Sequence, residues 1–587
     1  MRPDTTSPPA APAPPAARDE AGLLAALPRW AVAGILVIIA AATVLVTGLI
    51  AGHAWQIGIE EEWTWPFYPN PSPWVMAMPS LVLGILLSAV AIFALVRGVN
   101  SRAGEAIALV LCLALALGLI VDLGNAGPAG AFEAVPVTAY PWISGYYGEA
   151  VRIDDMGAYL RHYPERISAL KVNDPSGYGH LSDHPAGPVV FHWWVNRTMD
   201  RFPAMAQRFA PDDRTTHAMA RRLAESDGLT GWPLTDGQFA GIWASALLFR
   251  LGYWLALLPL YLLVREFHGP RQAILAVALA AMIPALHLFG PYPDQFFPLF
   301  NVFAFYAWIM AFRRRNLLWA GLSAATVVLG LQWSMAMLAV GPMIGIATLL
   351  MLWREWAGRR SFRSSCGAAA PGCGSSAGEG ARPTLPAGES SGGKSCGAAA
   401  PGCGSLAGEG ACPTHRRSWL APVIVWFAVF AVATLLPMML FGYDGIRVWK
   451  ICLAQHATFA DVFPRSRWSW TLFNPVEFVV FTGVPAALLM LLAAAADAVR
   501  CGRFRWNAAP AVTVWSLLGV LAVLNLSGKN LGETARLWMM LMPFAAAAAA
   551  PALAALERRR WGAAPLVLAL TLLQLAVFRL HLNVHSL

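Results

Sequence analysis

The residues best suited to chemistry lie in one polar stretch, from Tyr146 to Trp194. It holds five carboxylates between Glu149 and Asp174, and histidines beside a Pro-Ala-Gly-Pro turn. A carboxylate can accept a proton from an attacking hydroxyl group, and a cation can hold an anion through charge-assisted hydrogen bonds. The same composition is also typical of a solvated loop with a surface helix. The candidates in this stretch are Glu149, Arg152, Asp154, Asp155, His180, Asp183 and His184.

A structural explanation competes for the acidic residues of this stretch. Ile153, Met156, Leu160 and Ile167 recur at helical spacing, which predicts an amphipathic helix lying on the membrane surface. Two aspartates directly precede Met156, near the start of that pattern, where the helix dipole favours negative charge. These carboxylates can therefore cap a helix as well as take part in catalysis.

Further polar groups stand at the edges of long apolar runs. They are Glu60, Glu61 and Glu62 with Trp63 and Trp65, the run from Pro291 to Gln295, the run from Ser527 to Trp538, and a weaker group of Asp444, Lys450 and His456. Ionisable residues at membrane depth are costly and usually functional, although the cost is smaller at the edge of a span. An arginine or lysine here can hold phosphate. The residues expected to bind substrate are Arg152, His180, His184, Asp294, Gln295, Lys529, Glu533 and Arg536.

The composition places the chain in a membrane. Of its 587 residues, 57% are hydrophobic and 13% are charged, whereas soluble proteins carry about 25% charged residues. The net charge of +9 comes from basic residues near the ends of apolar runs, as membrane topology requires, so it does not indicate a nucleic-acid partner. The sequence contains no HExxH motif, which argues against a membrane metalloprotease, and no Rossmann fingerprint.

Long apolar runs predict an all-α polytopic membrane protein with about 13 transmembrane helices, because backbone polar groups inside a bilayer must be satisfied within each helix. The predicted spans are residues 30–52, 75–97, 105–123, 238–265, 270–290, 294–312, 317–333, 336–353, 418–441, 474–498, 510–526, 537–556 and 562–580. Arginines in alternate loops place the N-terminus in the cytoplasm and the C-terminus outside the inner (plasma) membrane.

The spans divide the chain into successive parts. Residues 1–29 form a disordered cytoplasmic N-terminus, 30–123 the first three spans, and 124–237 a large extracytoplasmic loop with surface helices and the candidate motifs. Residues 238–353 form spans four to eight, 354–417 a cytoplasmic low-complexity loop, and 418–587 the remaining spans. In the cytoplasmic loop, residues 365–384 return at 395–414 without apolar periodicity, which indicates a disordered insertion.

The motifs and their order resemble the membrane-embedded glycosyltransferases of the GT-C class. Protein O-mannosyltransferases carry an acidic pair, a surface helix and then His-Pro-Pro, and the lipid A aminoarabinose transferase has a comparable acidic first loop. Related predicted bacterial integral membrane transferases share three motifs, which here read Arg152-Ile153-Asp154-Asp155 with Tyr159-Leu160-Arg161, Asp183-His184-Pro185-Ala186-Gly187, and Gly532-Glu533-Thr534-Ala535-Arg536-Leu537-Trp538. Ala186 replaces the usual second Pro, and the loop follows the third span rather than the first.

The resemblance implies a hexosyl- or pentosyltransferase that moves a sugar, with inversion, from a polyprenyl-phosphate donor to an envelope glycan, lipid or protein. The leaving polyprenyl phosphate would be held by Arg152, His184, Lys529 and Arg536. The acidic pair of the mannosyltransferases lines up with Gly148–Glu149, so the catalytic carboxylate is Glu149, Asp154 or Asp155. Some members use a divalent cation, Mg²⁺ or Mn²⁺, but no cofactor is certain and the sequence defines no ligand set.

Two other functions stay open at the level of the sequence. A transporter or lipid flippase would share the apolar bulk and an outward polar cavity. Transporters often contain inverted repeats, however, and the loop 124–237 has no counterpart in the second half of the chain. A non-catalytic scaffold of an envelope complex would tolerate replacement of the outer carboxylates.

Overall fold

The computed structural model describes ten stretches of the chain, which are almost entirely helical. They are residues 22–69, 74–99, 101–124, 134–140, 145–171, 179–211, 213–226, 229–367, 420–502 and 510–584. Within them, the only strands are β1 (Gly58–Ile59) and β2 (Trp63–Thr64), which form an antiparallel hairpin. The N-terminal residues 1–20 and nearly all of the 365–414 repeat, both predicted to be disordered, lie outside the described residues.

Nine helical segments of the described chain are long and apolar enough to cross a membrane. They are α2 (Arg29–Ala51), η2 with α3 (Trp74–Ala77 and Met78–Arg97), α4 (Arg102–Gly124), α12 (Asp236–His268), η4 with α15 (Pro293–Phe296 and Phe297–Arg314), η5 with α17 (Met335–Ala339 and Val340–Gly367), α18 (Leu420–Phe441), η6 with α24 (Met539–Leu541 and Met542–Arg559) and α25 (Ala563–His581). Each of them overlaps a predicted span.

Other predicted spans are broken or shorter. The shorter apolar helices are α13 (Pro270–Ala281), α16 (Leu317–Trp333) and α22 (Pro510–Ser527). After α13 the chain breaks and resumes as α14 (Pro284–Leu288), because Pro284 cannot donate a backbone hydrogen bond. The predicted span 474–498 consists of α20 (Arg467–Thr482) and α21 (Val484–Gly502), bent by 114°. Gly483 joins them with φ +99°, a conformation that side chains disfavour.

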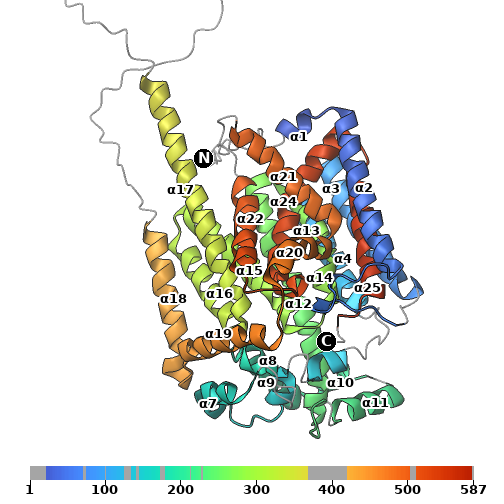
Figure 1. The fold of residues 1–587 in the computed structure, drawn as a ribbon, viewed down its shortest axis with the longest axis vertical. Helices are drawn as coiled ribbons and strands as arrows, with labels where there is room; N and C mark the ends of the chain where they lie inside the picture. Colours follow the sequence, from blue (N-terminus) through green and yellow to red (C-terminus); the bar gives the residue numbers. More distant parts are fainter. Residues whose placement is uncertain are drawn as a thin grey trace, which may run out of the picture.

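Short helices gather at one end of the helix bundle. They are α5 (Ala134–Ala139), α6 (Tyr146–Ala150), α7 (Met156–Ala169), α8 (Gly179–Ser182), α9 (Gly187–Arg201), α10 (Pro203–Phe209), α11 (Arg214–Ala224) and, from later in the chain, α19 (Gly445–Val462) and α23 (Thr534–Leu537). Figure 1 shows α7 to α11 and α19 at the lower end, near the C-terminus. The short helix α1 (Gly22–Ala26), from the segment predicted to be disordered, lies at the upper end.

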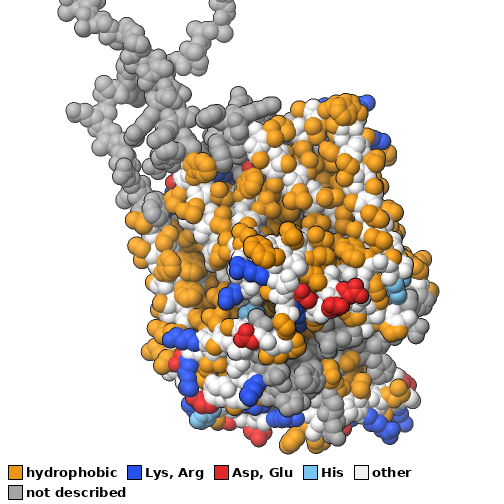
Figure 2. Space-filling model, in the orientation of Figure 1, with side chains coloured by type: hydrophobic (Ala, Val, Ile, Leu, Met, Phe, Trp, Pro, Cys, Tyr) orange, Lys and Arg blue, Asp and Glu red, His pale blue; other side chains and the backbone are white. Residues whose placement is uncertain are grey.

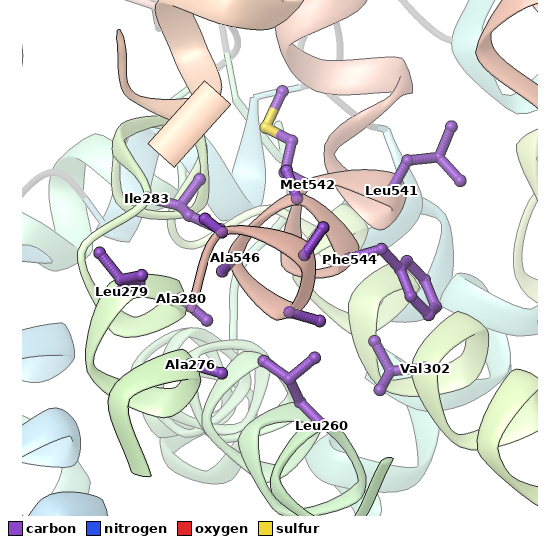
Figure 3. Packing of buried hydrophobic residues seen from close by; sticks show 14 of the residues in the cluster. Leu260, Ala276, Leu279, Ala280, Ile283, Val302, Leu541, Met542, Phe544 and Ala546 are labelled. Atoms are coloured by element: carbon purple, nitrogen blue, oxygen red, sulfur yellow. The ribbon is translucent and has the colours of Figure 1, made fainter. Parts of the chain in front are cut away.

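The core of the bundle lies among α12, α13, α15 and α24. Figure 3 shows Leu260, Ala276, Val302 and Ala546, one from each of these helices, gathered around a common space. The run of alanines from Ala545 to Ala550 makes one long stretch of α24 narrow, so that neighbouring helices approach its backbone closely. Helix α24 is consequently almost wholly buried, whereas few residues of α18 are buried.

Apolar side chains also cover the outside of the bundle. Figure 2 shows them over most of the face drawn, with charged side chains gathered toward the lower end. Met439 of α18 and Leu472 of α20 are examples, with most of their surface exposed. Soluble proteins rarely expose such large apolar areas, but a lipid bilayer covers them at no cost. The prediction of an all-α, multi-pass membrane protein is therefore confirmed.

Candidate functional site

Four charged side chains of alternating sign form a row at the lower end of the bundle. Glu533 lies between two arginines, with Oε1 3.3 Å from Nη2 of Arg465 and Oε2 3.4 Å from Nη2 of Arg536. On its other side, Arg536 lies 3.5 Å from Asp294, measured from Nε to Oδ2. All four side chains are at most 15% exposed. We call Arg465, Glu533, Arg536 and Asp294 the charge row.

A tight loop places Glu533 and Arg536 one helical turn apart. Gly532 has φ +84°, and a Cβ there would lie 2.9 Å from Nη1 of Arg465, so the position needs glycine. Two side chains of α20 fix the loop that follows. Asn474 Oδ1 accepts from the Thr534 hydroxyl at 2.9 Å, and Glu477 Oε1 accepts from the Ala535 amide at 3.0 Å. The loop that carries Glu533 and Arg536 is therefore held by side chains of the helix α20.

The hairpin β1–β2 braces the other end of the row. Nη1 of Arg465 donates to the Leu531 carbonyl, and the guanidinium lies 4.8 Å from the centre of the Trp63 ring. Glu62 accepts hydrogen bonds from the Ser466 amide and the Trp470 indole, at 2.8 and 2.7 Å. The acidic and aromatic group at residues 60–65 thus supports the Gly532–Trp538 motif from a position distant in sequence.

Asp294 enters the row from η4, at the start of a membrane-crossing segment. The Trp333 indole donates to the Pro293 carbonyl at 2.9 Å and fixes this turn. Gln295, the next residue, is buried, and its Nε2 donates to the Leu286 carbonyl at 2.9 Å. The structure therefore brings Asp294 into the row and gives Gln295 a contact within the protein.

A second group, His180, Asp183 and His184, follows the short helix α8. His184 Nδ1 lies 2.7 Å from Asp183 Oδ1 and 3.0 Å from the His180 carbonyl oxygen, so a protonated Nδ1 donates to both. Burial would raise the pKa of Asp183, but the His184 ring, by its charge and hydrogen bond, and His180 hold this pKa at about 2. Burial would lower the pKa of His184, and Asp183 outweighs that effect and raises it. Asp183 and His184 form an ionic pair.

The turn after His184 is anchored on three sides. The Tyr163 hydroxyl donates to the His184 carbonyl at 2.9 Å, and the Ala186 amide points to the Tyr443 hydroxyl at 3.4 Å. At Gly187 a Cβ would lie 2.3 Å from the Gln332 carbonyl oxygen, so the glycine is required by close packing on the end of α16. The His-Pro-Ala-Gly motif is thereby held in one conformation.

The histidine group and the charge row interact electrostatically. Burial lowers the pKa of His180 to about 4, opposed by the charge of Asp183 and reinforced by that of Arg536. Asp294 and Arg536 likewise act on His184, in opposite directions. The centre of the Tyr146 ring lies 5.6 Å from the centre of the His184 ring. The charges of Asp183, Asp294 and Arg536 act on the Tyr146 hydroxyl. These groups therefore share one polar region.

The remaining predicted site residues have other surroundings. Both oxygens of Glu149 accept from Arg166, at 2.9 and 3.0 Å, and Glu149 is buried. Asp155 caps α7 by accepting from the Gly157 and Ala158 amides, as its position before the helix predicts. Asp154 is fully exposed and lies 3.8 Å from Arg197.

Two predicted cations also lie apart from the row. Nη2 of Arg152 donates to the Thr230 carbonyl at 2.8 Å. Lys529 is exposed, in the loop that leads to Gly532. The predicted residues that the structure brings together are His180, His184, Asp294, Glu533 and Arg536. Those it leaves apart are Glu149, Arg152, Asp154, Asp155, Gln295 and Lys529.

Arg465 is a member of the charge row that was not among the predicted site residues. Its position carried a signal, because Arg465 and Arg467 lie in a segment that the predicted topology places outside, where basic residues are less common. A cation retained there suggests a specific partner, and Glu533 is that partner. Asp183 was noticed beside His184 but was not assigned either, because adjacent residues do not reveal whether their side chains meet.

One group of the described residues can hold a metal ion. His180, Asp183 and His184 each offer one ligand atom, and these atoms lie within 4.8 Å of one another. The carboxylates of the charge row face arginines instead.

No protein-family model, curated protein or solved structure matches this chain. The function must therefore be inferred from the residues and their geometry.

Proposed function

We propose that this protein is an integral membrane glycosyltransferase of the GT-C type. It moves a sugar from a polyprenyl-phosphate donor to an envelope glycan, lipid or protein on the side of the membrane where α7 to α11 lie. The observation that carries this proposal is the charge row, a set of buried acidic and basic side chains at the lower end of the bundle. Such groups are costly to bury and are usually retained for function.

Arg536 is the residue suited to the donor phosphate. It is buried, and its Nε has no hydrogen-bond partner among the described residues. Its distances to Glu533 and Asp294, 3.4 and 3.5 Å, exceed those of strong charge-assisted hydrogen bonds, which are about 2.7–2.9 Å. The guanidinium therefore keeps donors for the two oxygens of a phosphate group.

Asp294 is the carboxylate best placed to act as the base. It lies in the row beside Arg536, in loose contact through one oxygen. Glu149, in contrast, has both oxygens occupied by Arg166, and Asp155 is occupied by backbone amides. A base needs a free lone pair within reach of the attacking hydroxyl group. We therefore favour Asp294 over the three carboxylates that the sequence suggested.

The reaction follows from these positions. The acceptor hydroxyl gives its proton to Asp294, and its oxygen forms a bond to the anomeric carbon. The bond from that carbon to the phosphate oxygen breaks, the configuration inverts, and the polyprenyl phosphate leaves with the electron pair. Arg536 stabilises the negative charge of the leaving phosphate, so positioning and charge stabilisation supply much of the rate.

The finer topology is part of this proposal. The nine long segments, the bent pair α20–α21 and the three shorter apolar helices correspond to the thirteen predicted spans. With this number the two ends of the chain lie on opposite faces, the N-terminus in the cytoplasm and the C-terminus outside the plasma membrane. Figure 1 agrees with such an arrangement, since α1 and the end of α25 lie at opposite ends of the bundle.

The test is sugar transfer by membranes that contain the protein, with a panel of radiolabelled polyprenyl-phosphate sugars as donors. We expect Arg536→Ala to lower the rate by about 100- to 1000-fold, the usual effect of removing one donor that stabilises transition-state charge. Arg536→Lys should keep part of the activity, because it preserves the charge and loses the second hydrogen bond. Arg208→Ala, an exposed arginine of α10, is the matched control and should transfer at the wild-type rate.

One observation favours a second candidate, a transporter for a lipid or a small molecule. Helices α20 and α21 form a span broken at Gly483, and broken spans often line the substrate sites of transporters. The assay separates the two functions. Accumulation of an intact labelled substrate across the bilayer, without a glycosylated product, would support transport and would contradict the glycosyltransferase.

A further inference from the structure

The group His180, Asp183 and His184 has the composition of a metal site. Two imidazoles and one carboxylate offer ligand atoms within 4.8 Å of one another. Around a zinc ion with bonds of about 2.1 Å, tetrahedral ligand atoms are roughly 3.4 Å apart, so small side-chain rotations bring the three donors into range. The sequence spacing, His-x-x-Asp-His, puts all three on one turn and the residue after it.

We propose that His180, Asp183 and His184 bind a divalent transition-metal ion of the zinc type. Mg²⁺ requires oxygen ligands, and Mn²⁺ also prefers them, whereas imidazole nitrogen suits Zn²⁺ and its neighbours. Three protein ligands, with one position left open, is the arrangement of zinc ions that act on substrates. The proposal therefore replaces the Mg²⁺ or Mn²⁺ that the family resemblance implies with a different ion at a defined place.

The surroundings prepare these side chains for an ion. To bind the ion, His184 must leave its ionic pair with Asp183 and lose the Nε2 proton. Its Nδ1 can then keep donating to the His180 carbonyl oxygen, which orients the ring and leaves the lone pair on Nε2. Ligating histidines usually have such a partner on their second nitrogen, which fixes the ring for the metal. The Tyr163 hydroxyl, which donates to the His184 carbonyl, fixes the backbone as well. Asp183 reaches the same ion once its side chain rotates away from His184 Nδ1.

The charges nearby are compatible with a cation and with a phosphate beside it. Asp294 acts electrostatically on His184, and Glu533 acts on His180, both as negative charges. Arg536, the residue proposed to hold the donor phosphate, acts on both histidines and so lies near the group. If the proposed glycosyltransfer is correct, the open position of the ion would take an oxygen of the donor phosphate, while Arg536 holds another.

The experiment measures metal binding by the purified full-length protein in detergent, stripped of metal and then titrated with Zn²⁺ or with Co²⁺. Co²⁺ reports its ligands through visible d–d absorption. We expect one bound ion per chain, and we expect His180→Ala and Asp183→Asn each to weaken binding by at least about tenfold. His162→Ala removes an exposed histidine of α7 outside the group and should bind as wild type does.

A further variant distinguishes loss of a metal ligand from loss of the folded structure. His180→Cys supplies a thiolate, itself a good zinc ligand, and should keep Co²⁺ bound while adding a sulfur-to-metal charge-transfer band. Absence of any bound ion in the wild-type protein, or equal binding by wild type and His180→Ala, would overturn the metal site. Sugar transfer by a protein that binds no metal would also count against it. Metal binding without transfer from any donor would leave the site standing and remove the proposed function.

Discussion

Two sets of carboxylates occupy the same end of the bundle, and they differ in how closely their partners hold them. Glu149 and Asp155, around the start of α7, are fully engaged: one accepts twice from Arg166, and the other caps a helix. Asp294 and Glu533 face arginines at the longer distances of 3.3 to 3.5 Å, with one long hydrogen bond, from Arg465 Nη2 to Glu533 Oε1. The first set stabilises local structure. The charges of the second set are less completely neutralised by their partners, so they can still interact with a substrate.

The difference shows what a motif can and cannot reveal. The acidic stretch before α7 attracts attention in the sequence because its carboxylates are close together. A reaction site needs charged side chains that are brought together from distant parts of the chain and are not fully neutralised by one another. The charge row is such a case, because Asp294 and Arg536 come from different helices. Preorganised groups of this kind can stabilise a transition state without reorganising first.

The largest expected effect separates the two sets by activity. Asp294→Asn should lower the rate of sugar transfer by about 100-fold or more, the usual contribution of a general base. Glu149→Gln should keep the wild-type rate per folded molecule, since Glu149 is held by Arg166. Rates are measured as labelled product per milligram of monodisperse protein, with Asp461→Asn, an exposed carboxylate of α19, as the control. Loss of transfer in Glu149→Gln alone would reverse the comparison.

The second effect concerns stability. Glu149→Gln removes the charge from an ion pair with one buried member. Breaking a buried pair costs about 3–5 kcal/mol, but Arg166 is 37% exposed and water partly screens it. We therefore expect the free energy of unfolding to fall by about 1–2 kcal/mol, measured by melting in detergent.

Glu165→Gln is the matched control for this stability measurement. Glu165 lies on α7, as Arg166 does, and pairs with Arg447 at 2.6 Å, but both side chains are 53% exposed. Its melting temperature should equal that of the wild type, because exposed pairs contribute little. Equal melting of Glu149→Gln and Glu165→Gln would show that burial does not distinguish these pairs.

The sequence predicts the parts of this molecule that depend on neighbours along the chain. The apolar runs predict the membrane segments. The position of Asp155, directly before an amphipathic pattern, predicts that it caps α7. The breaks inside spans were harder, because hydropathy averages over a window and does not register the bend at Gly483. The end of α16 at Trp333, in contrast, coincides with the end of the predicted span 317–333.

The candidate site depends on contacts across the fold, and there the sequence gives less. Glu533 and Arg536 share a motif, so their proximity was predictable, but Arg465 meets Glu533 only because α20 and α23 pack together. Asp294 comes from an even more distant segment. How closely an arginine holds each carboxylate is decided by such packing, and no local pattern distinguishes Asp294 from Glu149.

The smallest expected effect tests whether the charge row contributes to stability through its charges. Burial would raise the pKa of Glu533, but Arg536 and Arg465 outweigh burial and hold it below the ordinary value of 4.5. A carboxylate whose pKa is depressed by folding stabilises the protein above its unfolded pKa, and this contribution is lost as the pH falls through its folded pKa. The melting temperature of wild type should therefore exceed that of Glu533→Gln most clearly above pH 4.5.

On acidification below that value, the two melting curves should converge, because protonated Glu533 and glutamine are nearly equivalent in charge. Asp461→Asn, which replaces an exposed carboxylate of α19, should run parallel to the wild type over the same range. A difference between wild type and Glu533→Gln that stays constant, or grows at low pH, would show that Glu533 acts through its shape rather than its charge. Glu533 would then serve, as the pair of Glu149 and Arg166 does, to hold the local structure together.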